Sequence, residues 1–197
     1  MKAPITLILF FICSIITAQD IIVVDWSPEY KLTLADFKSE NTQIGETNLY
    51  SVYSSASLDY SVQMSNIQFM LTKNFNSKVS NRFFPESATI IAPDEDTALK
   101  MVDFAQYEFD VCELYARKFR KTLYEEKGTF SDISYVKPLF DNIRKEYNDR
   151  ITKAGKATDL GKKTEELKKL HEEVLKEIDE LSDFCKTCKP KKKKKKK

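Results

Sequence analysis

The chain has 197 residues, of which 31% are charged and 42% are hydrophobic, and its formal net charge is +2. That value conceals an asymmetry. When Lys2 and the nine lysines beyond Phe184 are set aside from the 32 basic residues, 22 basic residues face 30 acidic ones in residues 19–184, a net charge of −8. Sequence-specific nucleic-acid-binding domains concentrate lysine and arginine on a folded face, so this composition argues against that class.

The N-terminus has the pattern of a secretory signal. Lys2 precedes an apolar run from Ile5 to Ile16, and the small residue Ala18 follows as a cleavage site. The run is shorter than the roughly 20 apolar residues that span a bilayer. We therefore expect cleavage after Ala18 and a mature protein without a transmembrane span, located in a periplasm or secreted.

The residues before Pro93 predict β-strands. Tyr50–Met64 and Ile67–Phe75 are long segments separated by the polar pair Ser65 and Asn66, as in a hairpin. The candidate strands are Ile21–Val24, Leu32–Phe37, Tyr50–Met64, Ile67–Phe75 and Ser87–Ile91. We expect them to form an antiparallel sheet.

After Pro93 the pattern becomes helical. The acidic residues 94–96 suit a helix N-terminus, and apolar residues then recur every three or four positions from Val102 to Leu123, ending near Gly128. A second helix is predicted from about Ser131 to Ile151. A third follows Asp159, and its narrow apolar seam is a candidate surface for a partner helix; the seam comprises Leu160, Leu167, Val174, Ile178 and Leu181. Strands followed by helices indicate an α+β fold.

The segment from Phe104 to Lys121 reads F-A-Q-Y-E-F-D-V-C-E-L-Y-A-R-K-F-R-K. It resembles the active-site helix of a family of predicted secreted bacterial zinc-dependent proteases, whose members read H-E-Q-G-H-F-D, then Y-A-R-K and L-R-K. The matching residues are Gln106, Phe109, Asp110, Glu113, Tyr115, Ala116, Arg117, Lys118, Arg120 and Lys121. Residues 32–38 are similar to the family's L-T-W-x-D-F-K, with Leu34 at the tryptophan position. The resemblance covers about residues 26–155 and implies a zincin-like fold.

The residues that depart from the family pattern are those at the positions of the zinc ligands and the general base. In H-E-x-x-H the two histidines bind zinc and the glutamate acts as general base. The corresponding residues here are Phe104, Ala105 and Glu108, and a third family ligand, in a later T-x-H-G, corresponds to Ala154. The only histidine, His171, lies in the third predicted helix, where we interpret it as a packing or surface residue. The resemblance thus implies a relative without a catalytic site, a metal or a cofactor.

Three functional hypotheses follow, the third of which is a structural or envelope-associated protein tethered through its lysine tail. The first is an exported, catalytically inactive relative of these proteases that binds an unknown protein or an envelope polymer, with Phe104 filling the former metal site. The second is a hydrolase or peptidase with a non-standard metal site built from Glu108 with Asp110, Glu113 or Cys112.

The C-terminus adds two features. Cys185 and Cys188 form a C-x-x-C pair, for which we predict a local disulfide or a link to another chain, whereas Cys112 lies on the apolar stripe and is interpreted as an inert core thiol. The final lysines could bind an anionic polymer or form a solvated end; they are Lys191, Lys192, Lys193, Lys194, Lys195, Lys196 and Lys197. The predicted organisation is a signal peptide (1–18), an α+β domain (19–155), a charged helix (156–184) and a disordered tail (185–197).

Overall fold

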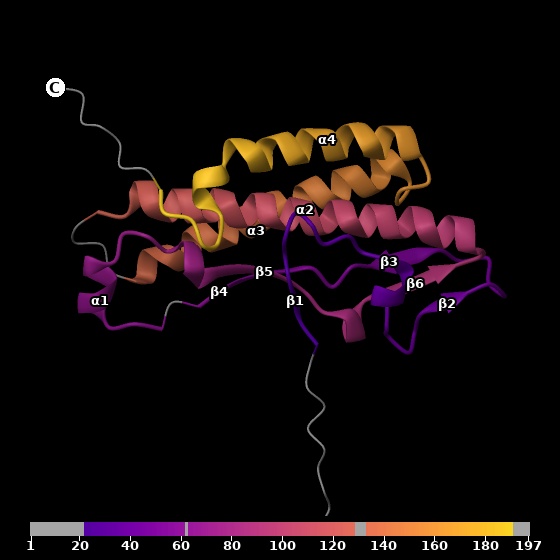
Figure 1. Ribbon diagram of the computed structural model, residues 1–197, viewed down its shortest axis with the longest axis horizontal. Helices are drawn as coiled ribbons and strands as arrows, with labels where there is room; N and C mark the ends of the chain where they lie inside the picture. Colours follow the sequence, from indigo (N-terminus) through magenta and orange to yellow (C-terminus); the bar gives the residue numbers. More distant parts are fainter. Residues whose placement is uncertain (1–21, 62, 129–132, 191–197) are drawn as a thin grey trace, which may run out of the picture.

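The computed structural model describes residues 22–61, 63–128 and 133–190 (Figure 1). The predicted signal peptide, residues 1–18, and the lysine run, residues 191–197, lie outside these ranges. The fold is α+β: short strands, turns and one short helix occupy the described chain up to Ala92, and long helices follow. Within the described residues, no helix is both long enough and apolar enough to cross a membrane.

The strands form two small sheets rather than one. In the first sheet, with the order β1-β5-β4, every pair is antiparallel. In the second, with the order β2-β6-β3, β2 runs parallel to β6, so the prediction of a single antiparallel sheet was wrong. The strands are β1 (Val24–Asp25), β2 (Gln43–Ile44), β3 (Ser51–Tyr53), β4 (Ser57–Tyr60), β5 (Val79–Phe83) and β6 (Thr89–Ala92).

The predicted hairpin after Tyr50 is not formed. Asn66–Leu71 is a helix, α1, and β4 pairs with β5 instead. Ser65 begins α1 through a capping box: its hydroxyl accepts from the backbone N–H of Gln68, and the Gln68 side chain accepts from the backbone N–H of Ser65. The segment predicted as a strand at 32–37 contains a 3-10 turn instead, Leu34–Asp36.

The three predicted helices are confirmed. The central one is α2 (Glu95–Glu126), and Asp94 caps it by accepting a 2.7 Å hydrogen bond from the backbone N–H of Thr97. It is followed by α3 (Val136–Thr158) and α4 (Thr164–Glu180). Further 3-10 turns are Asn76–Lys78, Pro85–Ser87, Ile133–Tyr135 and Ser182–Phe184.

Helix α2 is the centre of the molecule. It lies across strands of both sheets, while α3 and α4 pack against it from the other side (Figure 1). Being covered on both sides, α2 is buried over most of its circumference. The apolar seam of α4 is also buried, since Leu167, Val174 and Ile178 belong to the main core cluster. The idea that this seam awaits a partner helix was therefore wrong, because the chain's own helices cover it.

Candidate functional site

The positions that correspond to two zinc ligands and the base are filled with hydrocarbon. Phe104, Ala105 and Ala154 are all buried. The Phe104 ring stacks on Tyr107 with a centroid separation of 6.0 Å, and a Cβ built at Gly155 would lie 3.5 Å from Cζ of Phe104. The fold thus brings Phe104, at the position of the first ligand, against Gly155, which is next to Ala154 at the position of the third. The enclosed space between them is occupied by an aromatic ring.

Glu108, at the second histidine position, is a partly buried carboxyl group. Burial raises its pKa from 4.5 to about 7, and a hydrogen bond with Ser54 lowers it by a smaller amount. Ser54 itself is buried in the segment between β3 and β4. A carboxyl group in this environment is neutral at mildly acidic pH and becomes charged above neutrality.

Glu108 should make the protein less stable as the pH rises. The folded state holds the carboxyl proton more tightly than the unfolded chain, because its pKa is about 7 against 4.5. Stability is therefore full below about pH 4.5 and declines as the pH passes through 7, by on the order of 1–3 kcal/mol. Urea unfolding at pH 5 and pH 8 should show that Glu108→Gln removes this decline. The control Glu126→Gln, at the exposed end of α2, should retain the decline. An equal loss of unfolding free energy from pH 5 to pH 8 in wild type and Glu108→Gln would contradict the prediction.

Asp110 is the centre of a buried hydrogen-bond network. Its Oδ1 accepts from Nε1 of Trp26 at 2.7 Å, and its Oδ2 contacts Nε2 of Gln106 at 3.0 Å and Nε2 of His171 at 2.7 Å. Burial by itself would raise the pKa of Asp110, but hydrogen bonds from His171, Gln106 and Trp26 lower it below its usual value. Gln106 in turn accepts from the backbone N–H of Leu32 at 2.8 Å. The network ties the N-terminal segment and α4 to α2.

His171 is thus more than a packing residue, and its partner was missed in the sequence. Asp110 lies 61 residues earlier, so local spacing carries no signal for the pair. The side chain of His171 is partly exposed, and its ring also meets Tyr107 edge-on at 6.0 Å.

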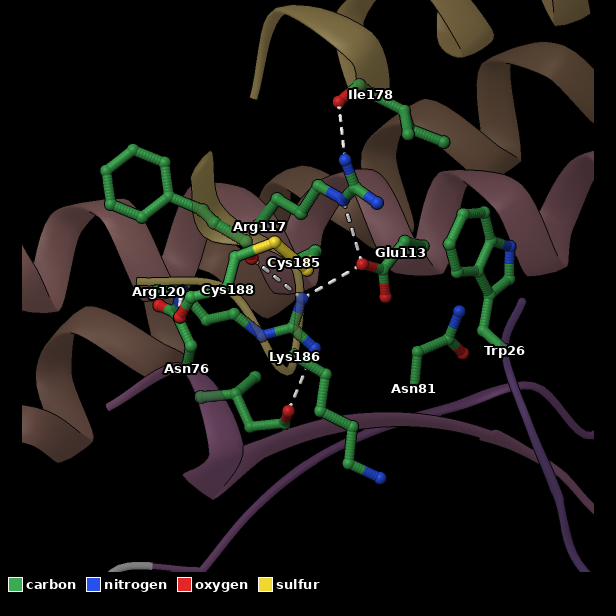
Figure 2. Close-up of polar contacts among 12 residues, drawn as sticks. Trp26, Asn76, Asn81, Glu113, Arg117, Arg120, Ile178, Cys185, Lys186 and Cys188 are labelled. Carbon is green, nitrogen blue, oxygen red and sulfur yellow. Dashed lines mark hydrogen bonds and ion pairs between the residues drawn. A yellow bond between two sulfur atoms is a disulfide. The ribbon is translucent and has the colours of Figure 1, made fainter. Parts of the chain in front are cut away.

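A second polar cluster joins two arginines to one carboxylate on α2 (Figure 2). Nε of Arg117 and Nη1 of Arg120 each donate to Oε1 of Glu113 at 2.9 Å. Arg117 also donates to the carbonyl of Ile178 at 2.8 Å, and Arg120 donates to that of Val79 at 2.9 Å. Arg120 is fully buried. These bonds fasten the end of α4 and the start of β5 to the central helix.

The segment that follows α4 is fixed to the same cluster. Arg120 donates to the carbonyl of Phe184 at 3.0 Å, and a disulfide joins Cys185 to Cys188 (Figure 2). The carbonyl of Cys188 accepts from the side-chain amides of Asn74 and Asn76, at 3.1 and 3.0 Å. The prediction of disorder from residue 185 was therefore wrong for residues 185–190, which dock beside β5. No local pattern could show that asparagines about 110 positions earlier hold this segment.

Cys112, the remaining cysteine outside the signal region, is fully buried. Burial raises the pKa of its thiol well above the usual value, with Glu113 adding to the shift. A thiol held in the neutral form is a poor nucleophile and a poor metal ligand.

Three acidic residues of α2, the ones that could have built a non-standard metal site, lie in separate environments. Glu108 contacts Ser54, Asp110 contacts Trp26 and His171, and Glu113 binds the arginines. Among residues 22–61, 63–128 and 133–190, no group of three histidine, cysteine or acidic side chains is arranged to hold a metal ion. What the contacts of Asp110 and Glu113 do is join distant segments to one helix.

The chain matches no family model, no curated protein and no solved structure. The resemblance to secreted zinc-dependent proteases therefore rests on the sequence alone.

Proposed function

We propose that the protein is an exported, catalytically inactive relative of secreted zinc-dependent proteases that acts by binding. The observation that carries this proposal is a division of roles along α2. The residues that match the family pattern, including Gln106, Asp110, Glu113, Arg117 and Arg120, hold the scaffold together through buried hydrogen bonds. The positions that correspond to the zinc ligands and the general base no longer carry a complete set of ligand side chains. Such a division is what loss of activity with retention of the fold would leave.

Catalysis by the family's mechanism needs groups that this chain lacks at those positions. Phe104, Ala105 and Ala154 have no donor atoms in their side chains, and Glu108 alone cannot replace three ligands and a base. His171 is held by Asp110. The alternative is a hydrolase with a non-standard metal site. It gains no support, because Glu108, Asp110 and Glu113 have different contact partners.

Export and charge suggest where the binding takes place. The signal pattern directs the chain out of the cytoplasm, and the mature body carries a net charge of −8 followed by a run of lysines. We propose that a protein or an envelope component is the partner, and that the lysine run contributes attachment to an anionic surface.

Restoring the family's ligands tests the relation. The variant Phe104→His/Ala105→Glu/Glu108→His should bind zinc more tightly than wild type, and adding Ala154→His should tighten binding by a further tenfold or more, because a third ligand completes the site. Zinc competition titration against a chromogenic chelator measures both steps. Lys153→His, which places the histidine one position earlier on an exposed site of α3, is the matched control. Equal zinc affinities for the Ala154→His and Lys153→His versions would refute the relation.

A further inference from the structure

The disulfide between Cys185 and Cys188 contributes little to holding the fold together. Its two cysteines have a sequence separation of 3 and lie in the same segment after α4, so the bond joins no two elements. The constraint that a disulfide places on the unfolded chain decreases with the length of the loop that it closes, and this loop is very short. A structural role therefore accounts poorly for the bond.

The segment that carries the disulfide is held in place by other contacts. The side-chain amide of Asn76 donates to the carbonyl of Cys188 at 3.0 Å and to that of Asp183 at 3.2 Å. Arg120 donates to the carbonyl of Phe184 at 3.0 Å. None of these three contacts involves a sulfur atom. We therefore expect the segment to stay docked, with its two cysteines adjacent, when the disulfide is reduced.

One of the two cysteines lines a cleft. The cleft has a volume of about 330 Å³ and is formed by the N-terminal segment, β5, α2 and the C-terminal segment. Among the described residues, Cys185 belongs to its lining and Cys188 does not, although both are partly exposed. Trp26 and Pro28 give the cleft an apolar part, and Figure 2 shows the disulfide on one side of Glu113 and Trp26 on the other. Cys185 is therefore the cysteine that a molecule entering the cleft meets.

The surroundings of the cleft carry more positive than negative charge. Its lining includes Arg117, Arg120 and Lys186, and its one carboxylate among the described residues is that of Glu113. Lys186, which stands between the two cysteines, pairs with Asp25 at 2.8 Å, so three cations face two carboxylates. Neighbouring lysine and arginine side chains stabilise a thiolate. A disulfide whose reduced form is stabilised in this way is a better oxidant.

We propose that the disulfide between Cys185 and Cys188 is exchangeable and oxidises thiols that enter this cleft. A substrate thiolate attacks Sγ of Cys185 and forms a mixed disulfide with it, while the bond to Cys188 breaks and Cys188 leaves as a thiolate. A second substrate thiolate attacks the substrate sulfur of the mixed disulfide and releases the thiolate of Cys185. Two electrons and two protons thus pass from two substrate thiols, which become a disulfide, to the two cysteines of the protein.

The substrate thiols belong either to two cysteines of a polypeptide or to two molecules of a small thiol, because both offer the same reacting group. This activity goes beyond the proposed function. It uses none of the positions that correspond to the zinc ligands, so it is independent of the loss of zinc chemistry.

Thiol exchange with the folded mature chain, residues 19–197, tests the proposal. The oxidised protein is mixed with an excess of a reduced peptide that contains two cysteines and, in a second arm, with reduced glutathione. Acid quenching, alkylation and mass spectrometry then count the thiols of protein and substrate. We expect one substrate disulfide for each protein disulfide reduced, with circular dichroism unchanged, and the arm that reacts faster identifies the source of the thiol. The variant Cys185→Ser/Cys188→Ser should oxidise neither substrate.

Two single variants test the role of the cleft and serve as matched controls for each other. Cys188→Ser and Cys185→Ser both lack the disulfide, so any loss of stability caused by its absence is common to the two. With oxidised glutathione, Cys188→Ser should form a mixed disulfide about tenfold faster or more than Cys185→Ser, because the cysteine that it retains faces the cleft and its cations. Cys112 is fully buried and should stay unmodified in both variants.

Two results would overturn the proposal. One is a disulfide that stays oxidised in both arms while the protein is folded and is reduced only after the protein is unfolded in urea; this would make the bond a structural staple. The other is an equal rate of mixed-disulfide formation by the two single variants, which would show that the cleft gives Cys185 no advantage.

Discussion

Replacing Arg120 by methionine is expected to lower the free energy of unfolding by about 3–5 kcal/mol, because it removes one partner of a buried ion pair. The guanidinium is fully buried and contacts Glu113, the carbonyl of Val79 and the carbonyl of Phe184. Methionine fills much of the volume but leaves the two carbonyl groups without their donor. The strand β5 and the C-terminal segment would both lose their attachment to α2.

Urea unfolding at neutral pH measures this effect. The control is Lys137→Met on α3, whose ion pair with Asp141 is largely exposed; screening by solvent makes such pairs weak, so its unfolding midpoint should stay at the wild-type value. An Arg120→Met midpoint as close to wild type as that of the control would show that the cluster does not hold the fold together.

Gly161→Ala should be comparably severe. Gly161 connects α3 to α4 with a φ of +95°, and a Cβ there would lie 2.2 Å from the carbonyl oxygen of Lys100 and 3.1 Å from Cβ of Phe104. Backbone strain and overpacking, each about 1–3 kcal/mol, add up to an expected loss of about 3 kcal/mol or more. The close approach of this glycine to Lys100 and Phe104 lets the turn between α3 and α4 pack against α2.

Gly45→Ala separates the two contributions in thermal or urea unfolding. Gly45 has a φ of +86°, but nothing lies within 4 Å of the position its Cβ would take. This variant should lose only the conformational part, about 1–2 kcal/mol. Equal losses for the two variants would mean that the contact with α2 is not tight.

The three long helices could be predicted from the sequence, whereas α1, β2 and β5 were missed and the other strands were predicted with inaccurate bounds, for a physical reason. The apolar stripe of α2, from Val102 to Leu123, repeats over about six turns, so its period is unmistakable, whereas the strands are two to five residues long. The apolar run at Ile67 fits a strand or a helix equally well. The Ser65 and Gln68 capping box, which favours the helix, was the signal available to decide it.

Within the candidate site, only contacts between residues that are close in the sequence could be predicted. Glu113 and Arg117 stand four apart on one helix, a spacing that brings opposite charges together. Asp110, in contrast, contacts Trp26 and His171, which lie 84 and 61 residues away in the sequence. That Phe104 stands where the family pattern has a histidine could be seen by comparing residue types. Its position against Gly155 required the fold.

The most direct test of the proposed loss of catalysis is the zinc content of the mature protein, purified without a histidine tag from cells supplied with zinc and measured by mass spectrometry. Near-zero zinc per chain is the expected result, because the positions of two ligands and the base carry hydrocarbon side chains. One zinc ion per chain that disappears in Glu108→Gln would contradict it and would identify a working metal site at the position of the second histidine.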